Sequence, residues 1–219
     1  MNIIWIAPPA AGKGTYSSIF KDKYEFTHIS AGDTLREQVS LNTEIGKEIS
    51  GILNEGKMVD DNLMKKLIRN KLLNIDLSKP FMLDGYPRRL NQAIDYEDIL
   101  KELNIESPKV IFINIDKETG LKRILSRVNC PNCKRSYNLS NDNFKPKVDG
   151  VCDDCGSPLM HRSDDNEESY ENRYNTYFNE TKDLIEKYRR ENNLIEVDGT
   201  KSPEDNIKEI IKILGVNND

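Results

Sequence analysis

The sequence predicts an α/β fold in which helices cover both faces of a parallel sheet. Five short apolar runs, rich in β-branched residues, have the length and composition of strands buried on both faces. They are residues 3–6, 26–29, 81–83, 110–115 and 194–197. Helical patterns lie between these runs, and strands that alternate with helices favour a parallel sheet. At 219 residues the chain has room for one large domain, or for one core with small insertions.

Three of the helical patterns carry clear signals. In the first, the stretch Asp60-Asp61-Asn62 supplies an N-cap ahead of an apolar stripe at Leu63, Leu67, Ile68 and Leu72. The other two show helical spacing at Ala93, Ile94 and Leu100, and at Ile207, Ile210, Ile211 and Leu214. We expect a helix in each of these stretches.

The composition limits the classes of partner. The formal net charge is −5, which disfavours a nucleic acid or an anionic membrane as partner, since both attract basic surfaces. The N-terminal apolar run lacks the basic flank of a signal peptide, and no later stretch is long enough to cross a membrane. We therefore expect a cytoplasmic protein with no nucleic-acid or membrane partner.

Residues 7–15, APPAAGKGT, follow the first apolar run and lead into a helix start, the context of a Walker A phosphate loop. Such a loop lays its backbone N–H groups around phosphates at a helix N-terminus. Lys13 would reach the β and γ phosphates, and Thr15 lies where the hydroxyl near Mg²⁺ belongs. Ala7 and Ala10 occupy glycine-like positions, where a positive φ would cost on the order of 1 kcal/mol or more. An ordinary surface turn is the alternative.

The stretch from about residue 130 to 160 lacks an apolar period and is too long for an unsupported loop. Its four cysteines form two Cys-x-x-Cys pairs separated by 18 residues: Cys130, Cys133, Cys152 and Cys155. Four thiolates on two such turns can converge on one Zn²⁺ in a closed, structural site, which would replace the missing core. A redox motif and two disulfides are the alternatives, which a cytoplasmic location disfavours.

Arginines at the ends of elements are candidates for binding phosphate, because a planar guanidinium binds phosphate oxygens with two parallel hydrogen bonds. Lysine outnumbers arginine in this chain. The candidates are Arg36, Arg88, Arg123, Arg127, Arg162 and Arg173. A surface role is the alternative for each of them, and nearby Asp164 and Asp165 could orient arginines or form a solvated run.

Asp84 follows the apolar run at 81–83. A carboxylate at the carboxyl end of a central parallel strand would lie beside the phosphate loop, where it can hold Mg²⁺ through water. The alternative is a turn-forming aspartate before Gly85. His28 and His161 show no partner pattern for acid–base chemistry, and Trp5 is expected in the core.

Taken in order, these segments resemble adenylate kinases of the long bacterial kind with a zinc-holding lid. The likeness covers nearly the whole chain and rests on several motifs in register: GKGT at 12–15, GDTLR at 32–36, GKMV at 56–59, LDGYPR at 83–88 with Gln92, the four cysteines, RSDDNEE at 162–168 and VDGTK at 197–201. The resemblance implies a sheet order of 2-3-1-4-5. It also implies a core of residues 1–29, 60–123 and 163–219, an AMP-binding flap at 30–59 and a lid over ATP at 124–162.

The resemblance also implies roles for single residues. For ATP binding these are Ala10, Ala11, Gly12, Lys13, Gly14, Thr15, Arg123, Arg127, Ser136, Tyr137, Gly199 and Lys201. For AMP binding they are Ala31, Arg36, Lys57, Met58, Val59, Gly85, Tyr86, Pro87, Arg88, Gln92, Arg162 and Arg173, with the Gln92 amide on the adenine edge. The catalytic set is Lys13, Asp84, Arg88, Arg123, Arg127, Arg162 and Arg173. The Tyr86–Pro87 peptide is expected to be cis.

The chain departs from the family pattern at four positions. Ala7 and Ala10 replace loop glycines, and Ala31 stands where the family usually has a threonine that contacts AMP. Val128 replaces the second arginine of a pair that begins at Arg127. These departures bear on affinity and rate more than on the class of reaction.

The reaction implied is ATP + AMP ⇌ 2 ADP with Mg²⁺, carried out by a monomer. The attacking AMP phosphate has a second pKa of about 6, so no general base is needed, and the direct in-line transfer that the resemblance implies involves no covalent intermediate. A kinase for UMP or CMP is disfavoured by Gln92 but left open by the hydroxyl that Ala31 lacks. A zinc-ribbon protein that binds nucleic acid, with a relic phosphate loop, is disfavoured by the acidic balance and the arginines.

Overall fold

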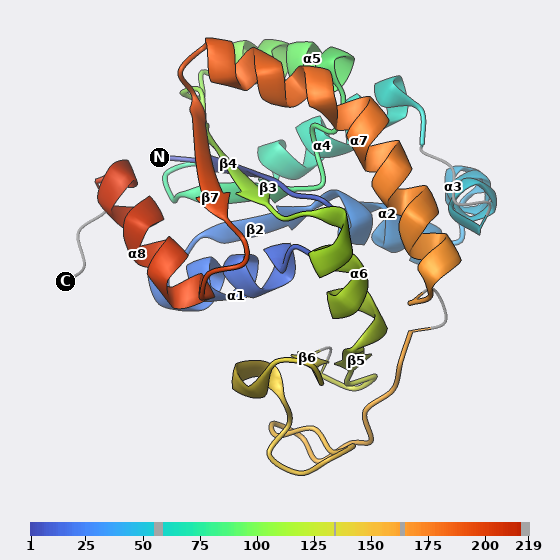
Figure 1. The fold of residues 1–219 in the computed structure, drawn as a ribbon. Coiled ribbons are helices and arrows are strands. Elements are labelled where there is room, and N and C mark those ends of the chain that lie inside the picture. Colours follow the sequence, from blue (N-terminus) through green and yellow to red (C-terminus); the bar gives the residue numbers. More distant parts are fainter. Residues whose placement is uncertain (55–58, 134, 163–164, 216–219) are drawn as a thin grey trace. The chain divides into compact units, whose positions relative to one another are not determined.

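The computed structural model describes residues 1–54, 59–133, 135–162 and 165–215 (Figure 1). They fall into two compact units. The first comprises Met1–Ala7, Gly12–Ile113 and Glu180–Asp219, and the second Pro8–Ala11 and Asn114–Asn179. The division into core, flap and lid uses other boundaries and stays a prediction.

The first unit is built on a sheet of five strands: β1 (Ile3–Ile6), β2 (Thr27–Ser30), β3 (Phe81–Asp84), β4 (Lys109–Asn114) and β7 (Leu194–Asp198). Their order is β2-β3-β1-β4-β7, and β7 is the fifth strand of this sheet along the chain. The predicted order 2-3-1-4-5 is therefore confirmed. Central β1 runs parallel to β3 and β4, with Ile4 opposite Leu83 and Val110.

The predicted strands agree with the observed ones to within one residue at either end. The central strands were predictable because their apolar side chains are almost completely buried; all four residues of β1 are buried. Trp5 lies in the core, as predicted, and packs edge-on against Phe20 with ring centroids 5.2 Å apart. Its indole N–H points at the Met82 sulfur, 3.4 Å away.

Helices cover both faces of this sheet, and the first unit holds α1 (Lys13–Tyr24), α2 (Ala31–Ser40), α3 (Glu44–Asn54), which packs on α2, α4 (Asp61–Leu73), α5 (Leu90–Glu102) and α8 (Pro203–Leu214). Figure 1 shows α1 and α8 on one side of the sheet and α4 and α5 on the other. The predicted N-cap of α4 is confirmed and is Asp60, which accepts from the backbone N–H of Asn62 at 3.0 Å. In α5 the stripe differs from the expectation, since Ile94 is 49% exposed and Tyr96 is buried instead.

The second unit holds α6 (Lys117–Leu125), β5 (Arg127–Asn129), β6 (Ser136–Asn138), a 3₁₀ turn η1 (Asp142–Phe144) and the beginning of α7 (Glu167–Arg190). Strands β5 and β6 form an antiparallel hairpin, with Val128 opposite Tyr137. The core around this hairpin is small; its buried members are Val128, Cys130, Tyr137 and Cys152. The structure thus agrees that apolar burial alone does not hold this segment.

Gly120 of α6 allows a close approach within the second unit. A Cβ at this position would lie 2.1 Å from the Tyr170 hydroxyl oxygen and 3.2 Å from the Pro9 carbonyl oxygen. Tyr170 is fully buried, and its hydroxyl donates to the Lys117 carbonyl at 3.0 Å. Glycine is unfavourable inside a helix, so its presence here is explained by this packing.

Among the described residues, no helix is both long and apolar enough to span a membrane.

Candidate active site and metal centre

The phosphate loop joins β1 to α1, and two of its residues have positive φ. Gly12 has φ 89° and forms the N-cap of α1, and Ala10 has φ 64°. Ala7 is not among the described residues with positive φ. The strain considered for the two alanines is therefore present at Ala10, where a left-handed conformation costs on the order of 1 kcal/mol.

The lysine of the loop meets the carboxylate at the end of β3. Lys13 Nζ lies 2.6 Å from Asp84 Oδ1, and the two side chains are only 25% and 16% exposed. Trp5 of β1 pairs with Asp84 across the parallel ladder, which brings the ends of the two strands to the same edge. The predicted position of Asp84 beside the phosphate loop is thus confirmed.

A third group, which the sequence did not connect with this pair, is His28 of β2. Its Nε2 lies 3.6 Å from the second oxygen of Asp84, Oδ2. Burial by itself would raise the pKa of Asp84, but Lys13 and His28 outweigh burial and hold that pKa well below its usual range. Asp84 is therefore ionised at neutral pH and able to attract a hydrated divalent cation. The sequence carried no signal for this contact, which follows from the parallel register of β2 and β3, with His28 opposite Met82 and Ser30 opposite Asp84.

The loop after β3 brings several predicted AMP-binding residues together. The Tyr86–Pro87 peptide is cis, as predicted. Arg88 Nε donates to the Gly85 carbonyl at 3.0 Å. The Gln92 side chain is buried; its Oε1 accepts from the Arg88 backbone N–H at 2.8 Å and its Nε2 donates to Asp61.

The beginning of α2 adjoins this loop. Ser30 caps the helix by accepting from the backbone N–H of Asp33, and Ala31 is buried. A Cβ on Gly85, which has φ 81°, would lie 3.6 Å from the Ala31 Cβ and 3.2 Å from an Arg88 nitrogen. Of the other residues predicted for AMP, Val59 is buried and Arg36 is exposed and paired with Asp33 at 2.6 Å. Lys57 and Met58 lie outside the described residues.

The second unit carries the remaining arginines. Arg127 Nε donates to Asp165 Oδ2 at 2.8 Å, and the Asp165 side chain is completely buried. Asp165 therefore orients an arginine, one of the two roles considered for it; Asp164 lies outside the described residues. Arg162 donates to Asn129 Oδ1 at 3.2 Å, an oxygen that also accepts from Ser136. Arg123 lies on α6 and Arg173 on α7.

The turn after β7 contains Gly199 and Lys201, both predicted for ATP. The buried Asn206 of α8 ties this turn to α1, because its Nδ2 donates to the Asp198 carbonyl at 2.8 Å and to the Tyr16 hydroxyl at 2.7 Å. Sequence reasoning missed Asn206, which is a polar residue beside an apolar stripe. It fixes the turn relative to the helix that begins at the phosphate loop.

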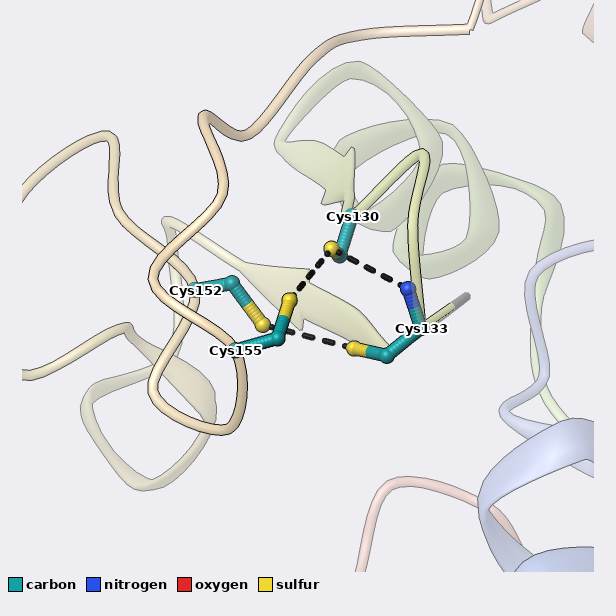
Figure 2. Close-up of side chains that lie close together, drawn as sticks. All are labelled: Cys130, Cys133, Cys152 and Cys155. Atoms are coloured by element: carbon teal, nitrogen blue, oxygen red, sulfur yellow. Dashed lines mark hydrogen bonds between the residues drawn. The ribbon is translucent and has the colours of Figure 1, made fainter.

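The four cysteines converge as predicted (Figure 2). Their sulfur atoms all lie within 4.8 Å of one another, and all four are free thiols rather than disulfides. A tetrahedral site with zinc–sulfur bonds of about 2.3 Å has sulfur–sulfur separations of about 3.8 Å. The donor set therefore fits a four-coordinate metal, with no position left for substrate.

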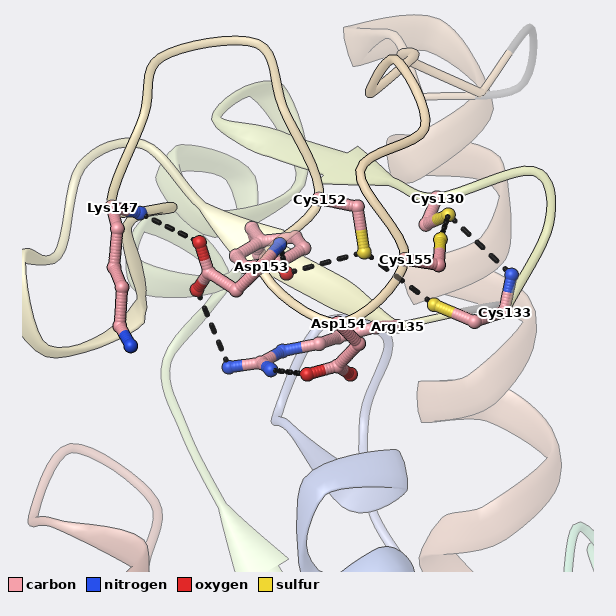
Figure 3. Close-up of polar contacts among 9 residues, drawn as sticks. Cys130, Cys133, Arg135, Lys147, Cys152, Asp153, Asp154 and Cys155 are labelled. Atoms are coloured by element: carbon pink, nitrogen blue, oxygen red, sulfur yellow. Dashed lines mark hydrogen bonds and ion pairs between the residues drawn. The ribbon is translucent and has the colours of Figure 1, made fainter.

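Polar contacts around the sulfurs fix the two cysteine turns (Figure 3). The Cys133 backbone N–H donates to Cys130 Sγ at 3.4 Å, and the Tyr137 hydroxyl contacts Cys152 Sγ at 3.4 Å. That hydroxyl also accepts from the Asp153 backbone N–H at 2.7 Å. Arg135 lies over the Tyr137 ring and pairs with Asp153 and Asp154. Tyr137, predicted for ATP, is thus buried within the cysteine cluster.

Comparison with known proteins is consistent with this architecture. A family profile described as adenylate kinase matches residues 5–193. The chain is 42% identical over 215 residues to an adenylate kinase of Fervidobacterium nodosum, covering 98% of each chain. It is 40% identical to an adenylate kinase of Thermosipho melanesiensis, covering 98% of this chain and 99% of the other. An adenylate kinase of Archaeoglobus fulgidus is 42% identical, with 98% of each chain covered.

Proposed function

The chain belongs to the adenylate kinase family and is a nucleoside monophosphate kinase, and we propose how its own residues carry out ATP + AMP ⇌ 2 ADP. The observation that carries the proposal is the contact between Lys13 and Asp84 at the carboxyl edge of the sheet. At that edge the Lys13 ammonium can bind the phosphates of ATP, and the ionised Asp84 carboxylate can bind the hydrated cation that accompanies them.

The transfer breaks the bond between the γ-phosphorus and the β–γ bridging oxygen of ATP and forms a bond to an AMP phosphate oxygen. Because that phosphate is largely ionised at neutral pH, no proton has to be removed by the protein. Lys13 and the backbone N–H groups of residues 10–15 would neutralise charge on the transferred group and its leaving oxygen. Mg²⁺ bound with ATP supplies further charge neutralisation, and Thr15 and Asp84 are the residues that would hold it, Asp84 through water.

The arginines are assigned by motif. We propose Arg123, Arg127, Arg162 and Arg173 for the phosphates of the two nucleotides, and Arg36 and Arg88 for AMP. The buried carboxylate of Asp165 supports the assignment of Arg127, since an arginine held in one orientation loses less freedom when it binds phosphate. Gly199 and Lys201 are proposed for ATP. The Tyr137 side chain contacts Cys152, so we expect Tyr137 to bind ATP through its main chain. Ser136 is exposed and is therefore accessible to ATP.

For the cysteine cluster we propose one structural Zn²⁺ per chain. Four thiolates without an open position support zinc in a structural rather than a catalytic role. The net charge of −5 supports the absence of nucleic-acid and membrane partners, and we propose that the protein is cytoplasmic and acts as a monomer.

A coupled ATP/AMP assay, with zinc quantified on the same sample, tests these assignments. Lys13→Met should lower turnover by at least about a hundredfold, because one preorganised charge at the transferred phosphate is removed. Lys21→Met, which removes an exposed lysine from the same helix, should leave turnover unchanged. Near-normal turnover of Lys13→Met would refute the site. Rates with AMP, CMP, UMP and GMP test the preference for AMP.

A further inference from the structure

Gln92, the residue expected to recognise adenine, has its side-chain amide held at both ends. Its Nε2 donates to Asp61 Oδ1 at 2.7 Å, and its Oε1 accepts from the Arg88 backbone N–H at 2.8 Å. Gln92 is only 2% exposed, so water competes little for either bond. The two partners therefore define which end of the amide is oxygen and which is nitrogen.

A glutamine amide can usually turn end for end, because its two ends have nearly the same shape. In this site the turn would place the NH₂ group against the Arg88 N–H and the oxygen against the Asp61 carboxylate. The first is a contact between two donors and the second a contact between two acceptors. Both would be poorly hydrated, where unmatched polar groups are most unfavourable.

Asp61 is itself well anchored. It is the first residue of α4, directly after the N-cap Asp60, and its side chain is 25% exposed. The oxygen that accepts from Gln92 also forms an ion pair with Arg89, whose Nη2 lies 2.9 Å away. A carboxylate can only accept, so Asp61 can hold the nitrogen end of the amide but never the oxygen end.

These two bonds use one N–H and one oxygen lone pair of the amide, and a primary amide has a second of each. A purine with a 6-amino group presents an N–H donor beside a ring-nitrogen acceptor, which pairs with such an amide in two hydrogen bonds. A 6-oxo purine has a carbonyl acceptor in place of the amino group, and that acceptor would face the fixed amide oxygen.

We propose that Asp61 is a specificity-determining residue: by fixing the orientation of the Gln92 amide, it selects 6-amino over 6-oxo purine monophosphates. Asp61 acts through Gln92 and is a positioning residue, not a catalytic one. The inference rests on the proposed role of Gln92 in binding AMP.

The test compares adenosine and inosine monophosphates, which differ only at C6 and N1 of the base, as acceptors from ATP. Asp61→Asn keeps the shape of the side chain but can donate as well as accept, so residue 61 no longer opposes the turned amide and only the Arg88 N–H still does. We expect the ratio of kcat/KM for the adenosine over the inosine substrate to fall by about tenfold, mainly through a gain for the inosine substrate. Asp61→Ala, which removes the anchor, should shift the ratio in the same direction.

Arg89→Met is the matched control, since it removes the other partner of Asp61 and leaves the Gln92 bond in place; its ratio should equal that of the unmodified protein. If Gln92→Leu leaves the ratio unchanged, Gln92 does not bind the base, and the AMP-site assignment fails together with the inference. If Gln92→Leu lowers the ratio while both Asp61 variants keep it, the assignment stands and the role of Asp61 is overturned. The ratio within one variant is independent of the fraction folded, so reduced stability does not obscure the result.

Discussion

The sheet of the first unit and the cysteine-bearing segment of the second are stabilised in different ways. In the sheet, the apolar side chains of β1, β3 and β4 are at most 7% exposed, and the rings of Tyr16 and Phe20 from α1 pack against Trp5. Around the hairpin of β5 and β6, the buried core has four members, and two of them are cysteines of the cluster. The first region is stabilised by apolar burial, whereas for the second we propose that a metal bound by the four sulfurs supplies the stability that burial does not.

This difference has a functional consequence. A region held by burial must keep its apolar residues inside and can offer only the ends of its strands for chemistry, as at Asp84. A region held by a metal leaves nearly all its other side chains available to solvent and ligand. The two regions should therefore respond differently to a substitution at a buried position. In the cysteine-bearing segment it should change the metal content, and in the sheet it should change the free energy of unfolding without changing the metal content.

The largest effect is expected from removing a ligand of the cluster. Cys152→Ser should abolish metal binding and unfold the segment between residues 129 and 160, because structural zinc sites contribute on the order of 10 kcal/mol to folding. Hydrogen exchange should show protection lost in that segment and kept in the sheet, while zinc falls from about one per chain to near zero.

The neighbouring Val151→Ser is the control, since it introduces the same side chain on an exposed residue that is no ligand. It should keep both the metal and the protection. A Cys152→Ser protein that retained zinc and a protected segment would show that this region is not held by the metal, and the contrast with the sheet would disappear.

A smaller effect is expected in the sheet. Ile4, in central β1, is 1% exposed, and Ile4→Ala should lower the free energy of unfolding by about 2–5 kcal/mol through lost burial and the cavity left behind. Its zinc content should not change. Urea unfolding measures the first quantity and metal analysis the second.

Ile213→Ala makes the same chemical change on α8 at a position that is 55% exposed, and should cost little. Equal losses for the two variants would contradict the assignment of Ile4 to a tightly packed core. Loss of zinc in Ile4→Ala would mean that the two regions are not independently stabilised.

The same contrast explains what the sequence could predict. The strands and the cysteine cluster leave local signatures, namely apolar runs and cysteine spacing, so the strands and the convergence of the four cysteines were predicted correctly, while the zinc stays a proposal. Helix α7, with 24 residues, was missed because tyrosines such as Tyr170 and Tyr188 supply much of its buried surface and leave no simple apolar stripe.

Contacts between distant residues were also beyond the sequence. The approach of His28 to Asp84 depends on the register of β2 and β3, and the bond from Gln92 to Asp61 depends on how α4 and α5 pack. Asp61 carried only the signal of a helix start. Local patterns therefore located the candidate site, while the partners that orient its side chains required the tertiary structure.

The smallest effect is expected in the phosphate loop, where neither apolar burial nor a metal explains the backbone conformation. Ala10→Gly removes the left-handed strain of about 1–2 kcal/mol at φ 64° but adds about 0.5–1 kcal/mol of backbone entropy in the unfolded chain. The net change should be a stabilisation of up to about 1 kcal/mol, measured by urea unfolding without nucleotide.

Ala7→Gly is the matched control. Because Ala7 is not among the described residues with positive φ, only the entropic cost applies and this variant should be destabilised. Opposite signs for the two glycine substitutions would locate the strain at Ala10, whereas destabilisation of both would show that the loop carries no such strain.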